Sequence, residues 1–268
     1  MGVRNPSLAI GVTIVVAIVI ATILGPLVFR VDPLSIDLAN TLAPPSRVHP
    51  FGCDSLGRDV LARILWGARL SLSISTVVVA ISMVVGSLIG ATAALSGGRI
   101  DNLIMRGVDI VLAFPGILLA IALAAILGPG LIDLAIALTA MGWTGYARIV
   151  RAEVLSLRER DYILAAESLG AGRTRLLMHH LLPGVVGPLA VQATFGIGGI
   201  IGAEAALSFL GLGALPPTPS WGNMLDAGRA FLLVAPHLTT APGLAIGLSI
   251  LGFNLMGDGI AQKVGHRA

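Results

Sequence analysis

The chain has 268 residues, of which 56% are hydrophobic and only 12% charged, and its mean hydropathy is +0.93. Soluble domains carry about 25% charged residues, and a chain with half that share could not cover its own surface in water, so an ordinary soluble fold is excluded. The net charge of +3 comes mostly from arginines scattered among apolar runs. Nucleic-acid binding uses a dense basic patch with aromatic side chains, which this pattern lacks.

The first apolar run covers residues 8–29, after a short polar N-terminal segment, 1–7. At 1.5 Å per residue, such a helix can cross the ~30 Å hydrocarbon core of a membrane. The run is longer than the apolar part of a signal peptide, and no small-residue cleavage site follows it. We therefore expect a retained transmembrane helix.

Residues 30–69 form a polar segment that we expect to be an external loop. Its five arginines alternate with aspartates, and it contains the single cysteine, Cys53, which has no partner for an intrachain disulfide. Residues 60–72 place apolar side chains on one helical face and most charged ones elsewhere. This amphipathic pattern predicts a short helix lying in the membrane interface.

Five further apolar runs follow, in a predicted core permease-like domain of residues 70–262. They cover 70–95, 103–127, 131–149, 182–215 and 238–256. With the first run they predict an all-α integral membrane protein of six transmembrane helices. Gly86 and Gly90 have the four-residue spacing that lets two helix backbones approach closely.

The positive charges predict the orientation of these helices. With the N-terminus inside, eleven Lys and Arg residues lie on the cytoplasmic side and six outside. Because basic residues are enriched in cytoplasmic loops, we expect both termini, including the tail 263–268, to be cytoplasmic.

Two loops of the core domain contain further predicted elements. In the external loop 214–237, a proline-rich stretch is followed by a short amphipathic element that starts at Trp221. The inner loop, residues 148–183, holds 10 of the 31 charged residues. It reads as a helix, a flexible elbow at Gly170–Gly172, a second short helix and then Pro183. Such a compact element can dock into a groove of a soluble partner.

The usual catalytic patterns are missing from this sequence. Lys263 is the sole lysine and has no neighbouring glycine-rich loop, so a phosphate-binding loop of the G-x-x-x-x-G-K-[ST] type is impossible. His179 and His180 are adjacent rather than one helical turn apart, and no set of metal ligands emerges. We therefore expect neither an enzyme nor a metal site.

Two acidic residues lie inside predicted membrane helices, namely Asp109 and Glu204. An ionised carboxylate in the bilayer costs several kcal/mol unless it has a partner or faces water, so both are candidates for a translocation pathway. The alternative is a buried helix–helix hydrogen bond, which is equally compatible with Glu204. For Asp109 a structural role is favoured over a pathway role, because Arg106 lies one helical turn away and could pair with it.

The inner loop resembles the Glu-Ala-Ala signature of permease subunits of ABC importers. Five positions match at the right spacing: Ala165, Ala166, Gly170, Leu182 and Pro183. Two positions depart from the signature, because Leu164 stands where its Glu is expected and His180 where its Ile is expected. Glu167 offers a carboxylate one turn further on.

Other blocks narrow the resemblance to the second permease subunit of dipeptide, oligopeptide and nickel importers. They are residues 49–63 with 67–69, residues 204–225, and residues 254–259. These blocks lie in the same order as in that family and cover nearly the whole chain after the first run.

The resemblance implies a type I ABC importer permease and its partners: a sister permease, two cytoplasmic ATPase domains that bind ATP and Mg²⁺, and an external binding protein that delivers peptides. It implies a multi-pass location in a bacterial or archaeal cell membrane, with no cofactor in this chain. The implied ATPase-coupling residues are Ala165, Ala166, Glu167, Gly170, Ala171, Gly172, Leu182 and Pro183. The candidate contacts of the external binding protein are Trp221, Asn223 and Met224.

Three alternatives remain at this point. The same machinery could carry nickel, haem or another small solute, since specificity in such importers resembles a property of the binding protein. A proton-coupled carrier or channel could use Asp109 and Glu204 as a relay. An intramembrane enzyme is the weakest alternative, because no catalytic motif supports it.

Overall fold

The computed structural model describes residues 6–265, except for the side chains of Glu167, Arg173 and Thr174. All the regular elements of the described chain are helices. In chain order they are α1 (Pro6–Val28), a 3-10 turn (Leu38–Asn40), α2 (Val60–Ser96), α3 (Gly98–Leu112), α4 (Gly116–Leu127), α5 (Leu131–Arg158), α6 (Asp161–Ser168), α7 (Arg173–Leu176), a π-helical turn (Leu177–Leu181), α8 (Leu182–Phe209), α9 (Trp221–Arg229) and α10 (His237–Gly265).

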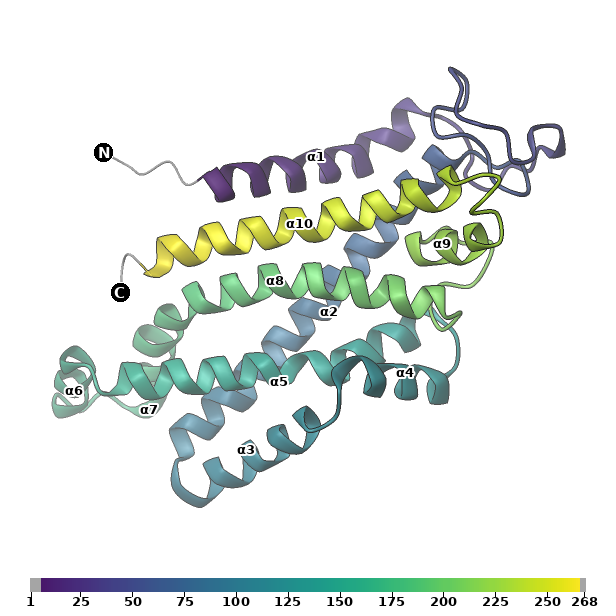
Figure 1. Ribbon diagram of the computed structural model, residues 1–268. Helices are drawn as coiled ribbons and strands as arrows, with labels where there is room; N and C mark the ends of the chain where they lie inside the picture. The colour runs from purple at the N-terminus through teal and green to yellow at the C-terminus, as the bar shows by residue number, and fades with distance from the viewer. Residues whose placement is uncertain (1–5, 266–268) are drawn as a thin grey trace.

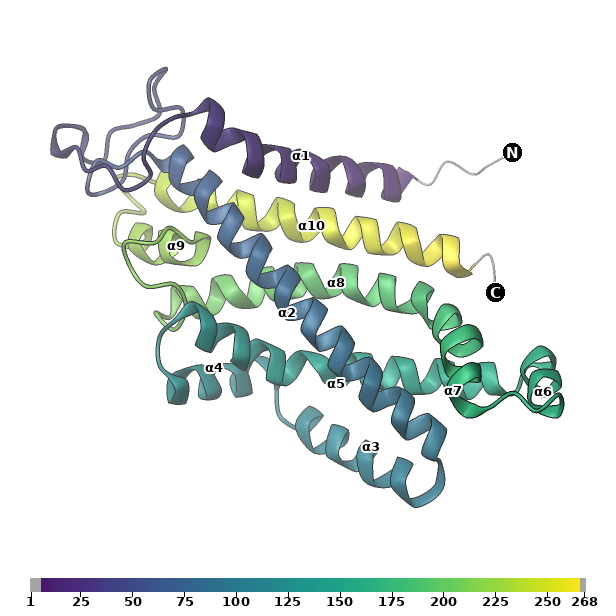
Figure 2. The same ribbon diagram turned by 180° about the vertical axis from the view of Figure 1, so that it is seen from behind.

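The long helices run between two ends of the molecule (Figures 1 and 2). The loop before α2, the helix α9 and the connections around them gather at one end. The helices α6 and α7 lie at the opposite end, where α1 also starts and α10 finishes. Of the predicted terminal segments, residues 1–5 and 266–268 lie outside the described part.

Within residues 6–265, four helices are long and apolar enough to cross a membrane: α1, α2, α8 with its preceding π turn, and α10. The pair α3 and α4 passes the same test only when taken together, with a bend of 82° between them. Helix α5 has 28 residues, enough for the thickness of a bilayer, but carries five charged residues. Composition and length thus support four spans, or five if the bent pair counts as one.

The predicted interfacial helix over 60–72 is not a separate element. Helix α2 starts at Val60 and continues without interruption to Ser96, so its first turns replace that helix. Asp59 caps the start of α2 by accepting a hydrogen bond from the Ala62 amide at 2.8 Å. No proline interrupts the helix between Val60 and Ser96. At 37 residues, about 55 Å long, α2 exceeds the hydrocarbon thickness.

The single helix predicted over 103–127 is also wrong, because the chain bends sharply at Ala113–Pro115. Pro115 has no amide hydrogen to continue the helix and disfavours a helical conformation of the residue before it. It stands instead at the start of α4. The run predicted over 182–215 ends as a helix at Phe209, just before Gly211, whose φ of +79° a helix cannot contain.

Small residues allow the closest helix contacts, as the Gly86–Gly90 spacing predicted. Helix α2 packs along α5, and a Cβ atom added at Gly86 or Gly90 would collide with the backbone of Trp143 or Ala147. Helix α1 packs along α10 in the same way, with Gly11 against the backbone of Met256. The bundle is therefore held by backbone proximity as well as by side-chain packing.

Candidate functional site

The inner loop has the predicted form of a helix followed by a glycine elbow. Helix α6 ends at Ser168, and Gly170 follows with a φ of +85°, a conformation that favours glycine. The amide of Ala171 donates to the carbonyl of Ala166 at 3.0 Å and closes the turn. Ala165 is exposed, and the neighbouring Leu169 is 89% exposed, so the elbow presents small and apolar surface to its surroundings.

Beyond the elbow the chain forms one continuous helical stretch instead of a separate short helix. Helix α7 passes directly into the π turn, and the π turn into α8. Pro183, which has no amide hydrogen, lies directly after the π turn in the first turn of α8. No loop separates the elbow from α8 beyond Gly172.

Buried side chains attach the inner loop to the membrane helices. Ile163, Leu176 and Leu181 are buried in one cluster with side chains of α5 and α8. Ala94 of α2 belongs to the same cluster, and its carbonyl accepts a hydrogen bond from Arg158 Nη1 at 3.0 Å. The loop thus contacts three long helices through a packed core. The side chain of Glu167 lies outside the described part of the chain.

Glu204 is fully buried between α8 and α2. The hydroxyl of Ser71 donates to its Oε2 at 2.7 Å, and the hydroxyl of Ser208 donates to its Oε1 at 2.8 Å. Ser208 could have been found from the sequence, because it lies four residues after Glu204 on the same helix face. Ser71 lies 133 residues away, and the sequence carries no signal for it. Glu204 therefore joins two helices, and its place on a pathway stays a prediction.

Asp109 lies on α3 and is exposed. Its Oδ1 accepts a hydrogen bond from Arg148 Nη2 of α5 at 2.6 Å, and not from Arg106 as the sequence suggested. Arg151 of α5 makes a second, bidentate pair with Asp101 of α3, with both distances 2.6 Å. The sequence carries no signal for the Asp101–Arg151 pair, because the two residues lie 50 positions apart. Together these ion pairs fix one face of α3 to α5.

The two predicted contact residues of α9 with the largest side chains are buried. Trp221 is 1% exposed, and its Nε1 donates to the carbonyl of Ile64 on α2 at 3.1 Å. Met224 is 7% exposed in an apolar cluster with α2 and α10. Both side chains pack α9 against longer helices, so their contact with an external protein stays a prediction. Asn223 is half-buried, and its side-chain amide donates to the carbonyl of Ala214.

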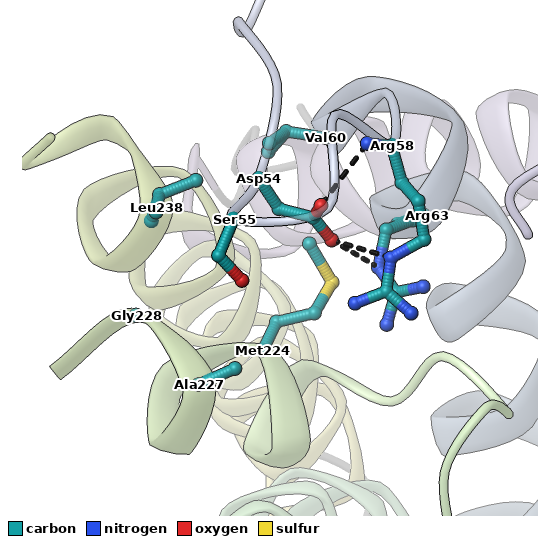
Figure 3. A pocket seen from close by; sticks show the side chains of 9 residues that line it. All are labelled: Asp54, Ser55, Arg58, Val60, Arg63, Met224, Ala227, Gly228 and Leu238. Atoms are coloured by element: carbon teal, nitrogen blue, oxygen red, sulfur yellow. Dashed lines mark hydrogen bonds and ion pairs between the residues drawn. The ribbon is translucent and has the colours of Figure 1, made fainter. Parts of the chain in front are cut away.

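A small polar pocket lies where the external loop meets α2, α9 and α10 (Figure 3). Asp54 stands at one side of it and accepts hydrogen bonds from the amides of Leu56 and Arg58. Its Oδ2 also pairs with Arg58 Nε at 2.7 Å and with Arg63 Nε at 3.6 Å. The volume of about 20 Å³ suits one water molecule rather than a peptide. The bonds of Asp54 tie the loop to the start of α2.

Cys53 is buried in the same loop. Burial, and then the nearby carboxylates of Asp59, Asp54 and Asp37, raise the pKa of its thiol. Asp59 in turn pairs with His49 Nδ1 at 2.8 Å and caps α2. The thiol is therefore held in its unreactive protonated form. Among the described side chains, no three or more His, Cys, Asp or Glu residues are arranged so that they could hold a metal ion.

Comparison with known proteins gives one family and several close relatives. Residues 82–268 match the family model of the binding-protein-dependent transport system inner membrane component. The chain is 43% identical over 261 residues to the dipeptide transport system permease protein DppC of Alkalihalophilus pseudofirmus, which covers 97% of this chain and 86% of the relative. It is 44% identical over 228 residues to the glutathione transport system permease protein GsiD of Escherichia coli. That alignment covers 85% of this chain and 75% of the relative.

A solved structure shares the fold at lower sequence similarity. A chain of the MetNI methionine ABC transporter in an inward-facing conformation superposes with a TM-score of 0.61 and 19% identity. The match covers 75% of this chain and 95% of the other.

Proposed function

We propose that this chain, which belongs to the family of binding-protein-dependent transport system inner membrane components, transports di- and oligopeptides. It is a permease subunit of an ABC transporter. The proposal is supported by relatives at 42–45% identity that are named as dipeptide, peptide and glutathione permeases. Nickel complexes, haem and other small solutes are the alternatives within the same machinery.

The proposed topology has six membrane passes, with both termini and the inner loop in the cytoplasm. Helix α5 supplies the sixth pass beside the four long helices and the bent pair of α3 and α4. Support comes from the shared end at which α1 starts, α10 finishes and the inner loop lies (Figure 1). The excess of Lys and Arg on that side agrees with the same orientation.

The inner loop is the proposed docking site of the ATPase partners. Its proposed contact residues are Ala165, Ala166, Glu167, Gly170, Ala171 and Gly172, while Leu182 and Pro183 carry the contact into α8. The support is the exposed elbow of small residues together with the buried cluster beneath it. An element that is exposed on one side and packed against α2, α5 and α8 on the other can transmit a rigid-body movement of its partner to the pathway.

Energy for transport is proposed to come from those partners, which bind ATP and Mg²⁺, since this sequence has a single lysine outside any phosphate-binding pattern. A sister permease would complete the pathway, and an external binding protein would deliver the solute. Asp109 with Arg148 remains the candidate charged group on the pathway, because both side chains are exposed. Glu204 is proposed to hold α8 to α2.

The test is solute uptake by the complex reconstituted from this chain, its sister permease, the ATPases and the binding protein. We expect uptake of dipeptides to require both ATP and the binding protein, and a pH gradient alone to drive none. Uptake without ATP would overturn the importer function, whereas ATP-dependent uptake of nickel or haem but not peptides would overturn only the proposed solute.

The coupling role of the inner loop is tested by Ala165→Glu. This exposed position can accept a glutamate without disturbing the fold, and we expect uptake to fall at least about tenfold, equal to about 1.4 kcal/mol of coupling. Gly265→Glu adds the same single negative charge at the exposed end of α10, outside the loop, and serves as the control. Normal uptake by Ala165→Glu in a complex that still assembles would contradict the role.

A further inference from the structure

Helix α1 contains a proline near its outer end. Pro26 lies inside the helix and has no amide hydrogen, so the carbonyl of Thr22, four residues earlier, loses its normal helical donor. In the hydrocarbon region a carbonyl without a donor costs several kcal/mol, and membrane helices tolerate proline only where a neighbour replaces the lost bond.

Arg69 of α2 supplies that replacement. Its Nε donates to the carbonyl of Thr22 at 2.9 Å, and its Nη2 donates to the carbonyl of Ile23 at 3.2 Å. The planar guanidinium can serve two neighbouring carbonyls at once, which the single ammonium of a lysine cannot do with the same geometry. An arginine in a membrane helix also needs such partners, because its charge is costly among lipid chains.

The surroundings of Arg69 hold it in this position. Its guanidinium lies over the ring of Trp66, 4.9 Å from the centroid, in a cation–π contact. One turn away, Gly25 of α1 lets Leu65 of α2 approach so closely that a Cβ atom would lie 2.8 Å from the leucine methyl groups. The proline, the glycine and the arginine therefore meet at one contact between α1 and α2.

Little side-chain packing holds the outer end of α1 elsewhere. Thr22, Leu65 and Ala68 line an apolar cavity of about 470 Å³ between α1, α2 and α10. Side chains of α1 beyond Thr22, such as Leu27 and Val28, are largely exposed. The hydrogen bonds of Arg69 therefore contribute more to holding α1 against α2 than the same bonds would inside a packed core.

We propose that Arg69 is a positioning residue that replaces the donor removed by Pro26, and that this contact fixes the outer end of α1 to the transport core. The family match begins at residue 82, after this contact, so the attachment belongs to the part of the chain that precedes the matched segment. Arg69 is needed only because residue 26 is a proline, so an amino acid with an amide hydrogen at position 26 should remove the need for Arg69.

The experiment is a double-mutant cycle on the assembled transporter, measured as the midpoint of thermal unfolding. Arg69→Met should lower the midpoint by about 3–8 °C, since methionine has no donor and leaves the carbonyl of Thr22 without one. Pro26→Ala returns the helical amide, so the combination of Pro26→Ala with Arg69→Met should recover most of that loss. Arg69→Lys should lie between Arg69→Met and the original protein.

Arg229→Met is the matched control, because Arg229 also lies at the outer end and stacks on an aromatic ring, Phe209, at 5.6 Å. Its effect should be the same in the original protein and in the Pro26→Ala variant. Equal losses for Arg69→Met in both backgrounds would overturn the proposal. If Arg69→Met yields no assembled complex, recovery of the complex by Pro26→Ala supports the proposal, and failure of that recovery overturns it.

Discussion

Glu204 shows how a buried carboxylate can be accommodated by hydroxyl groups without a basic partner. Two serine hydroxyls donate to its two oxygens, one from its own helix and one from α2. Burial of a polar group without such bonds costs far more than the bonds themselves contribute. The Ser71–Glu204–Ser208 group therefore specifies how α8 is placed against α2.

Removing one donor from this group should be costly. Ser71→Ala leaves Oε2 of Glu204 buried without its hydroxyl partner, and we expect the free energy of unfolding to fall by about 1–3 kcal/mol. Ser73→Ala is the control, because Ser73 is exposed on the same helix and bonds only to the carbonyl of Leu70. Equal stability of the two variants in thermal or denaturant unfolding would contradict the assigned role of Ser71.

The helices illustrate the limits of apolar runs as a guide to structure. The apolar runs correctly predicted where helices occur. However, Pro115 divides one predicted helix into α3 and α4, and the amphipathic stretch before residue 70 is part of α2 and not a separate helix. Both differences have local causes, a missing amide hydrogen at Pro115 and a strong cap at Asp59. The spacing of Gly86 and Gly90 predicted a close contact correctly, although the partner helix, α5, could not be read from it.

Close contact between α2 and α5 should be sensitive to a single methyl group. Gly90→Ala places a Cβ against the Ala147 carbonyl, and we expect a loss of about 1–3 kcal/mol from overpacking. Gly107→Ala adds the same methyl group on α3, where nothing lies within 4 Å, and should be neutral or slightly stabilising. A neutral Gly90→Ala in unfolding measurements would show that the two helices can separate without cost.

The molecule as a whole has two different ends. One carries the external loop, with its buried cysteine and its network of aspartates and arginines, together with α9. The other carries the inner loop, with its exposed glycine elbow (Figure 2). In the proposed orientation, these ends face opposite sides of the membrane.

Single cysteines introduced at the two ends test the orientation. Leu233→Cys is expected to react with a membrane-impermeant thiol reagent in intact cells, whereas Leu169→Cys should react only after permeabilisation. Both positions are exposed, and the proposed orientation places them on opposite sides of the membrane. The native Cys53 should add little background, since burial raises its pKa and shields it. The unmodified protein is the control, and the reverse labelling pattern would invert the topology.

The sequence by itself determined the class of this protein, because low charge and long apolar runs depend only on composition and order. It also located the inner loop, since a helix, a glycine elbow and a proline are local features. Tertiary structure alone decided that Ser71 is a partner of Glu204, and it alone decided the partners of Asp109 and Arg69. These partners lie 39 to 133 residues away along the chain. Tertiary structure also buried Trp221 and Met224, because burial depends on which helices surround a residue and not on its neighbours in sequence.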